Sequence, residues 1–444
     1  KRRKKYKGDF VMSNSSSNGE DSLSFLSVTA IGIGGMVGGG IFAVLGLAVK
    51  LGHGGTPLAF LIAGLVALIT SYSYARLSVT YPSEGGTVEF LVKGFGEGIF
   101  TGGLNVLLWV SYVIMLALYS YAFGGYAASF FPESVQPVLR HVFISGIMIL
   151  FTVLNSMGSK LVGEAEELIV GIKLTILIGF VGVGALNVDF ARVAPGNWTS
   201  LPTLLAGGMI IFLGYEGFEL MANSAEDVRN PEETLPKAFY TAVGFTVLLY
   251  IAISFITVAN LPVSQIVSAK DYALAAAAEP VLGQVGFVII AIAALLSTSS
   301  AINATLYSTS RVSYIIAKDG ELPQTLEKKI WDQPLEGLFI TAGLGLLVAN
   351  LLDISSISVM GSAGFLLIFT AVNAANFQLH EETDSKRWLA GAGTVVCAIA
   401  FAALVWHGAS QLWDIFVLIG MIGGSFLIEA VYRGFTGRGI KASN

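Results

Sequence analysis

Charged residues are scarce in this 444-residue sequence: Asp, Glu, Lys and Arg make up 12% of it, about half the usual share in a soluble globular chain. Apolar residues fill 54%, and the mean hydropathy is +0.73. Because one soluble core could not bury so large an apolar excess, we expect most of the chain to lie in lipid. The net charge of -5 also argues against nucleic-acid binding, which depends on a basic surface.

Cysteine and histidine are scarce as well. The one cysteine, Cys397, lies in an apolar run, which excludes an intramolecular disulfide framework and a cysteine-rich zinc site. We predict no metal site, because the four histidines are scattered: His53, His141, His380 and His407. The serines at 297–300 form no nucleophile elbow, and no G-x-x-x-x-G-K-S/T phosphate loop is present. We therefore expect no catalytic residues, no enzymatic activity and no coupling to ATP.

Twelve apolar runs come close to the roughly 20 residues that a helix needs to cross the hydrocarbon core. The expected spans are 25–49, 58–81, 99–129, 136–156, 164–187, 203–226, 235–260, 284–317, 337–352, 357–379, 388–407 and 411–432. With the N-terminus inside, the inner segments hold 20 Lys and Arg residues and the outer segments hold 4. The positive-inside rule therefore predicts that both termini are cytoplasmic.

The first span is rich in glycine near its middle, at Gly34, Gly35 and the run Gly38–Gly40. Each glycine lowers helix propensity by about 1 kcal/mol, which predicts an interrupted helix at mid-membrane. The alternative is close helix packing through small residues, which is common in membranes.

The sixth span has a similar interruption, where Gly214 and Gly217 lie beside Glu216 and Glu219. A carboxylate at this depth is costly unless it faces water or a partner. Matching interruptions in spans one and six indicate a transporter built from two inverted five-helix repeats. Amide groups freed by the first break could bind a carboxylate, and carbonyl groups freed by the second could bind an ammonium group. A zwitterionic α-amino acid would satisfy both.

Lys173 lies nine residues after Glu164 in the fifth span, which places it roughly 13–14 Å into a core of roughly 30 Å. Burial disfavours the charged form of an amine, so such a lysine can lose its proton near neutral pH. Two interpretations follow. In the first, the lysine is permanently charged, replaces a bound cation and cross-links helices. In the second, it is a site of proton coupling.

Four segments have distinctive sequences: Val37–Phe42, Phe212–Glu219 with its continuation to Ala238, Ser299–Thr305 and Ala317–Pro323. They resemble signatures of the amino acid–polyamine–organocation (APC) superfamily, closest to the prokaryotic ApcT-type permeases, which are proton-coupled and sodium-independent. The resemblance covers nearly the whole chain after residue 22. It implies an all-α integral membrane protein with a LeuT-like fold: twelve transmembrane helices and a 5+5 inverted repeat with broken helices 1 and 6.

The chain is expected to have five parts: the two tails follow from the basic, Ser/Asn-rich start and the charge distribution, and the resemblance implies the repeats and the last two helices. The expected parts are a disordered cytoplasmic tail at 1–22, a first repeat at 23–187, a second repeat at 203–379, helices 11 and 12 at 388–432, and a cytoplasmic tail at 433–444.

The implied substrate site lies in the two breaks. Its residues are Val37, Gly38, Gly39 and Gly40 for the carboxylate, and Phe212, Leu213, Gly214, Tyr215 and Gly217 for the ammonium group. In ApcT-type permeases, the lysine that matches Lys173 occupies the place where sodium-coupled relatives bind sodium. Its expected neighbours are Gly34, Thr298 and Ser299, and a charged lysine there would exclude sodium.

Glu216 departs from the family's pattern, because many members have an apolar residue at this position, whereas Glu219 has acidic counterparts in some relatives. Glu216 would either hydrogen-bond the backbone that the breaks expose or bias the site toward cationic substrates. Glu219 is expected to be a structural or gating polar group.

These observations predict a secondary active transporter of L-amino acids in the cytoplasmic membrane of a prokaryote. It would work by proton symport and alternating access, without a cofactor, and with broad selectivity for neutral substrates. One alternative is an exchanger of amino acids or amines with the same fold. Another is an amino-acid sensor or a channel on the same scaffold, without active transport.

Overall fold

The computed structural model describes residues 22–157, 162–318, 335–408 and 412–436. Within these ranges all regular elements are helices, and eleven segments are long and apolar enough to cross a membrane. A shorter apolar helix, Leu335–Leu351, completes the predicted set of twelve. The all-α membrane class is therefore confirmed. Most of the two predicted tails, 1–21 and 437–444, lies outside the described residues.

The helices follow the predicted spans to within four residues at either end, except at the start of the eighth. The long helices are α1 (Phe25–Gly52), α2 (Thr56–Thr80), α4 (Ile99–Ala128), α5 (Gln136–Ser156), α6 (Val162–Gly184), α8 (Pro231–Asn260), α10 (Ala273–Lys318), α11 (Leu335–Leu351), α12 (Ile354–Gln378), α13 (Arg387–Gly408) and α14 (Leu412–Thr436). The eighth predicted span corresponds to the part of α10 after a kink at Gly283, where φ is 65°.

Short helices connect or extend these spans. They are α3 (Thr87–Phe95), α9 (Val263–Ala269) and the 3-10 helices η1 (Ala185–Asn187), η2 (Pro195–Asn197) and η5 (Lys270–Tyr272). The sixth span consists of α7 (Leu201–Ile210), η3 (Ile211–Tyr215) and η4 (Phe218–Asp227).

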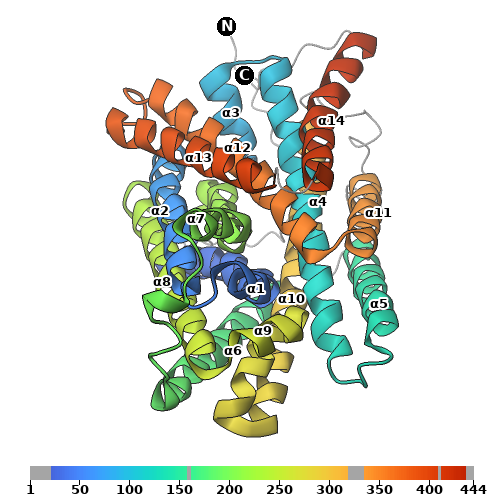
Figure 1. The fold of residues 1–444 in the computed structure, drawn as a ribbon. Coiled ribbons are helices and arrows are strands. Elements are labelled where there is room, and N and C mark those ends of the chain that lie inside the picture. The colour runs from blue at the N-terminus through green and yellow to red at the C-terminus, as the bar shows by residue number, and fades with distance from the viewer. Residues whose placement is uncertain (1–21, 158–161, 319–334, 409–411, 437–444) are drawn as a thin grey trace, which may run out of the picture.

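Helix α1 lies at the centre of the bundle, in contact with α2, α4, α8, α10, η3 and η4 (Figure 1). Every residue from 36 to 49 is buried. A helix that is buried on all sides belongs to the interior of a bundle, and this explains why α1 has no polar face. In Figure 1, α11 lies above α5 at the right-hand edge of the molecule, and the two helices contact each other.

The interruption predicted in the first span is absent, because α1 is one continuous helix of 28 residues. Its glycines serve close packing, which is the alternative considered above. A Cβ atom built on Gly40 would lie 2.6 Å from the carbonyl oxygen of Gly214, and one built on Gly39 would overlap the ring of Tyr119. The glycines therefore let neighbouring chains approach the helix, and this packing maintains the helix despite their low propensity.

The interruption predicted in the sixth span is present. Between η3 and η4, Glu216 is extended (φ -64°, ψ 150°) and Gly217 has φ 114°, a conformation that residues with a side chain rarely adopt. The carbonyl oxygen of Gly217 lies 2.8 Å from where a Cβ atom on Gly35 would be. Glycine is thus required twice at Gly217, by its backbone angle and by its contact with α1.

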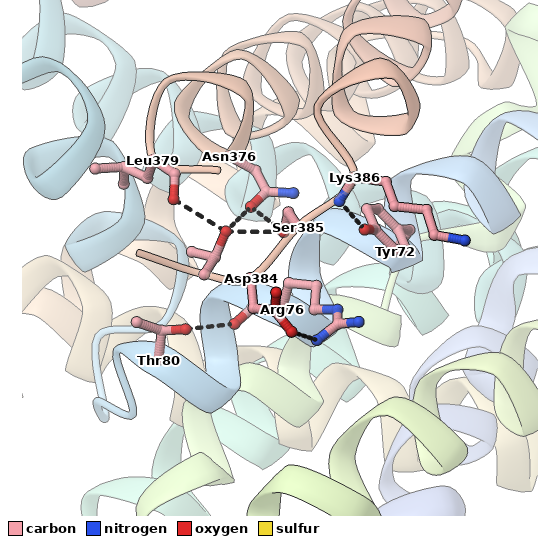
Figure 2. A network of polar contacts seen from close by, with 9 residues as sticks. Tyr72, Arg76, Thr80, Asn376, Leu379, Asp384, Ser385 and Lys386 are labelled. Atoms are coloured by element: carbon pink, nitrogen blue, oxygen red, sulfur yellow. Dashed lines mark hydrogen bonds and ion pairs between the residues drawn. The ribbon is translucent and has the colours of Figure 1, made fainter. Parts of the chain in front are cut away.

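Polar contacts join α2 to the connection between α12 and α13 (Figure 2). The backbone N–H of Lys386 donates to the hydroxyl of Tyr72, and the Ser385 hydroxyl donates to Asn376 Oδ1 at 2.9 Å. These bonds satisfy backbone and side-chain polar groups at the end of the spans, so they fix this connection against α2.

Cys397 lies at the same interface between α2, α12 and α13. Its sulfur atom is 3.3 Å from the Thr70 hydroxyl, and Asn373 Nδ2 donates to it at 3.7 Å. The residue is fully buried, so its thiol is a packed, hydrogen-bonded core group.

Replacement of Gly217 by alanine should lower the thermal stability of the protein, by about 1–3 kcal/mol, because it adds strain at positive φ and a clash with α1. The matched control is Gly244→Ala in α8, where an added Cβ meets no atom within 4 Å. That change should be neutral or stabilising by about 0.5–1 kcal/mol. Melting temperatures of both variants in detergent would test this. Equal melting temperatures would contradict the assigned role of Gly217.

Candidate substrate and ion site

Side chains from α8 and α10 donate hydrogen bonds to carbonyl groups in the middle of α1. Tyr250 donates its hydroxyl proton to Met36 O at 2.7 Å. Ser297 reaches Val37 O at 2.8 Å and also Gly38 O. A carbonyl oxygen has two lone pairs, so it can accept such a bond in addition to the helical one. The centre of α1 is therefore held by polar contacts as well as by packing.

Lys173 of α6 approaches the same helix from another side. Its side chain is 1% exposed, and its Nζ donates to Gly34 O at 3.1 Å. Of its other expected neighbours, Thr298 is buried but turns its hydroxyl to Ala294 O in its own helix at 2.7 Å. Ser299, the next residue, is half-buried. The structure thus brings together the lysine and the α1 backbone.

Backbone groups of η3 already have partners in this structure. The N–H of Leu213 donates to the Ser362 hydroxyl at 3.0 Å, and the carbonyl of Leu213 accepts the N–H of Glu216 at 3.2 Å. Phe212 is fully buried, with its ring edge-on to Phe369 at 5.9 Å between centroids. These residues form a packed wall between the break and α12.

The glycines of α1 that are predicted to bind the substrate carboxylate each face a different neighbouring element. Gly38 faces Ala301 of α10, Gly39 faces Tyr119 of α4, and Gly40 faces the backbone of η3. In a continuous helix, amide groups point along the axis toward the preceding turn. Binding of a carboxylate to these amides therefore requires α1 to unwind locally.

The two carboxyl groups of the sixth span lie together at the break. Glu216 is 4% exposed and accepts a long bond from the Tyr119 hydroxyl at 3.4 Å. Glu219 is 1% exposed and accepts bonds from the Tyr112 hydroxyl at 3.2 Å and from the Gly217 N–H at 2.8 Å. Glu219, and not Glu216, thus accepts a hydrogen bond from backbone that the break exposes.

One end of the site is closed by backbone pairing. The N–H of Leu23 donates to Asp227 O at 2.8 Å, and the N–H of Arg229 donates to Leu23 O at 3.0 Å. These bonds join the start of α1 to the chain that follows η4. The two interacting spans are therefore tied together at this end.

The opposite end of α1 is covered by η5. A Cβ atom on Gly46 would overlap the carbonyl oxygen of Lys270, so η5 lies directly on the helix. Asp271 forms an ion pair with Arg140 of α5 at 3.0 Å, and the guanidinium of Arg140 stacks on Tyr121 with 4.8 Å to the ring centroid. The middle of α1 is thus covered from both ends of the helix.

Several residues that contact the site were not predicted. Ser297, Tyr250 and Tyr119 bond to or pack against the α1 backbone or Glu216. The sequence signal for them is weak, because a tyrosine or serine in an apolar span does not reveal which neighbour its helix face meets. The cluster at 297–300 was a usable signal, since Thr298 and Ser299 are the predicted neighbours of Lys173, but the residue that bonds to the α1 backbone is Ser297.

In the part of the chain that the structure describes, eleven apolar spans accompany the buried helix α1, and the neighbouring sixth span is broken at mid-length, which is the architecture of a multi-pass membrane protein. The family model for amino acid permeases matches residues 23–426, so the chain belongs to this family, within the APC superfamily. It is therefore a permease that transports amino acids, and not an enzyme.

Individual relatives align with most of the chain. An uncharacterised protein of Methanocaldococcus jannaschii is 34% identical, with 94% of this chain and 96% of that protein covered. The inner membrane transport protein YbaT of Escherichia coli is 35% identical over 95% of this chain and 99% of its own length. The branched-chain amino acid permease BcaP of Bacillus subtilis is 24% identical, with coverage of 86% and 85%.

Replacement of Ser297 by alanine should weaken the attachment of α1 to α10, because it removes the hydroxyl whose single proton is shared between two carbonyl groups of α1. We expect a loss of stability of about 1–2 kcal/mol. The control is Ser425→Ala, since Ser425 is equally buried but donates to Met421 O of its own helix at 2.8 Å. Thermal unfolding in detergent would measure both. A loss in Ser425→Ala as large as in Ser297→Ala would contradict a special role for the α1–α10 bonds.

Proposed function

We propose that this permease is a proton-coupled, sodium-independent symporter of neutral L-amino acids that works by alternating access, with Lys173 as the coupling residue. The observation that carries the proposal is the contact of a fully buried amine with the backbone of the central helix, Lys173 Nζ to Gly34 O at 3.1 Å. A lysine is rare at this depth and marks an ion or proton pathway by default.

The coupling follows from the strength of this hydrogen bond in the two protonation states. A charged donor contributes about 1.5–3 kcal/mol and a neutral one about 0.5–1.5 kcal/mol. Loss of the proton from Lys173 therefore weakens the hold on α1 by about 1 kcal/mol or more, which shifts a two-state equilibrium several-fold. Because Gly35 touches Gly217 next to this bond, a movement of α1 also changes its contact with the broken span.

The substrate would bind between α1 and η3, where Gly40 and Gly214 now meet. Local unwinding of α1 at Gly38–Gly40 would present amide groups to the substrate carboxylate, and carbonyl groups of η3 would accept bonds from its ammonium group. This binding mode uses only the groups that all α-amino acids share. The apolar residues around it, such as Phe212 and Leu213, favour neutral side chains.

The membrane and orientation are also part of the proposal. The E. coli relative is named an inner membrane protein, which supports a place in a cytoplasmic membrane. The excess of Lys and Arg in alternate loops, 20 against 4, supports cytoplasmic termini. With this orientation, η5 covers α1 on the outer side and the Leu23 pairing lies on the inner side.

In proteoliposomes, an inward proton gradient should drive accumulation of radiolabelled L-alanine or L-leucine by the wild type, and Lys173→Ala should lose this accumulation. Counterflow, which needs substrate exchange without net proton movement, should survive in the variant at a reduced rate. The control is Lys50→Ala, because Lys50 lies at the exposed end of α1. It should behave as wild type in both assays.

Replacement of external potassium by sodium should leave the initial rate of wild-type uptake unchanged within a factor of about two, because a charged lysine and a sodium ion repel each other at one site. A sodium gradient that drives accumulation would overturn sodium independence. Uptake that ignores the proton gradient but requires internal amino acid would identify an exchanger. Full gradient-driven accumulation by Lys173→Ala would remove Lys173 as the coupling site.

A further inference from the structure

The helix type of the sixth span changes one turn before its break. Helix α7 ends at Ile210, and the chain continues as the tighter 3-10 helix η3, whose first residue, Ile211, has φ -88° and ψ 0°. Where one kind of helix passes into another, the regular series of backbone hydrogen bonds is disturbed. No water is available in the hydrocarbon core to replace lost partners, so side chains of neighbouring helices are the available source.

Ser362 of α12 bonds to the backbone on both sides of this change. Its hydroxyl donates to Ile210 O at 2.8 Å and accepts the N–H of Leu213 at 3.0 Å. A hydroxyl has one proton to donate and lone pairs to accept, so both bonds form together. Ser362 and Leu213 are fully buried. The hydroxyl therefore links the last residue of α7 to the third residue of η3.

Gly361, the residue before Ser362, lets α12 approach the side chain of the same leucine. A Cβ atom built on Gly361 would lie 2.7 Å from both Cδ atoms of Leu213 and 3.3 Å from Cγ2 of Ile114 in α4. Any larger residue at 361 would therefore displace the leucine. Leu213 is thus fixed twice by α12, by the hydrogen bond to its N–H and by the space left for its side chain.

The next turns of α12 hold the broken span by packing. Phe369 lies seven residues after Ser362, which is two helical turns. Its ring contacts Phe212 before the break, with 5.9 Å between centroids, and Phe218 after it, with 5.2 Å. These rings hold the two sides of the break apolar to apolar, whereas Ser362 acts on the backbone itself.

The bond to Ser362 also sets the direction of a carbonyl group. The C=O of Phe212 and the N–H of Leu213 belong to one planar peptide group, and in the trans form they point in opposite directions. Because the N–H points to Ser362, the carbonyl of Phe212 points away from it. This carbonyl is among those of η3 that are expected to accept a bond from the substrate ammonium group, and its oxygen has two lone pairs for this purpose.

We propose that Ser362 is a positioning residue for the substrate ammonium group, because it holds the Phe212–Leu213 peptide group in the orientation that presents the Phe212 carbonyl. The inference rests on the binding mode in the proposed function, in which carbonyl groups of η3 bind the ammonium group. It makes α12 a determinant of affinity for every α-amino acid, since all of them share this group. Loss of the hydroxyl should therefore weaken binding by the same factor for substrates of different size.

Hydrogen exchange measured by mass spectrometry tests the hold on the backbone without substrate. In Ser362→Ala the N–H of Leu213 loses its acceptor, so peptides that cover residues 210–216 should exchange about 2- to 10-fold faster than in wild type. The control is Ser358→Ala, because Ser358 is equally buried one turn earlier in α12 but donates to Ile354 O of its own helix at 2.7 Å. It should leave exchange in these peptides unchanged. Equal exchange in wild type and Ser362→Ala would overturn the proposal.

Counterflow of L-alanine and L-leucine tests the effect on substrate, and it reports binding whether or not transport is coupled to protons. In Ser362→Ala, KM should rise about 3- to 10-fold for both amino acids, with the maximal rate changed by less than about 2-fold. A purely structural bond would lower the amount of active protein and hence the maximal rate, and would leave KM unchanged. Ser358→Ala should keep the wild-type KM.

Two results of the counterflow assay would overturn the assignment. One is an unchanged KM in Ser362→Ala. The other is a rise in KM for L-leucine alone, which would place the serine near the substrate side chain. If a proton gradient fails to drive accumulation but KM rises equally for both substrates, the proposed coupling is wrong and the role of Ser362 stands.

Discussion

The contact between the backbones of Gly35 and Gly217 is the constraint on which the arrangement of the other elements depends. It brings the central helix and the interrupted span closer than any pair of side chains would allow. The approach places backbone carbonyls of α1 within reach of donors on α6, α8 and α10, and it confines the carboxyl groups of the break to the interior. The close approach of these two backbones therefore accounts for the packing at the centre of the bundle and for the polar contacts found there.

The second constraint on the structure is the placement of its buried ionisable groups. A membrane interior penalises each isolated charge, and the protein places its few ionisable groups where backbone groups or hydroxyls can satisfy them. Lys173 bonds to a helix carbonyl, and Glu219 bonds to the amide freed by the break. Both groups are anchored to backbone, of α1 in one case and of the break in the other, so a change in their charge also changes the hydrogen bonding of that backbone.

Sequence reasoning succeeded where one physical signal dominates. Hydropathy located all twelve spans, and the glycines and carboxyl groups of the sixth span located its break, because an αL backbone and a buried acid both need special local chemistry. The same reasoning was wrong for α1. Glycine lowers helix propensity, but it also permits tight packing, and which effect prevails depends on neighbours that are distant in sequence, such as Tyr119 and Gly214. The facing of Ser297 and Tyr250 depends on the same tertiary information.

The burial of the lone cysteine makes the protein a convenient starting point for labelling studies. Since Cys397 is enclosed between α2, α12 and α13 and hydrogen-bonded to Thr70, water-soluble maleimides will reach it far more slowly than a cysteine introduced at the surface. Probes could therefore be placed in pairs at exposed positions such as Leu26 and Leu282, without first removing the native thiol. Distances between such probes would report how the two ends of the bundle separate during a transport cycle.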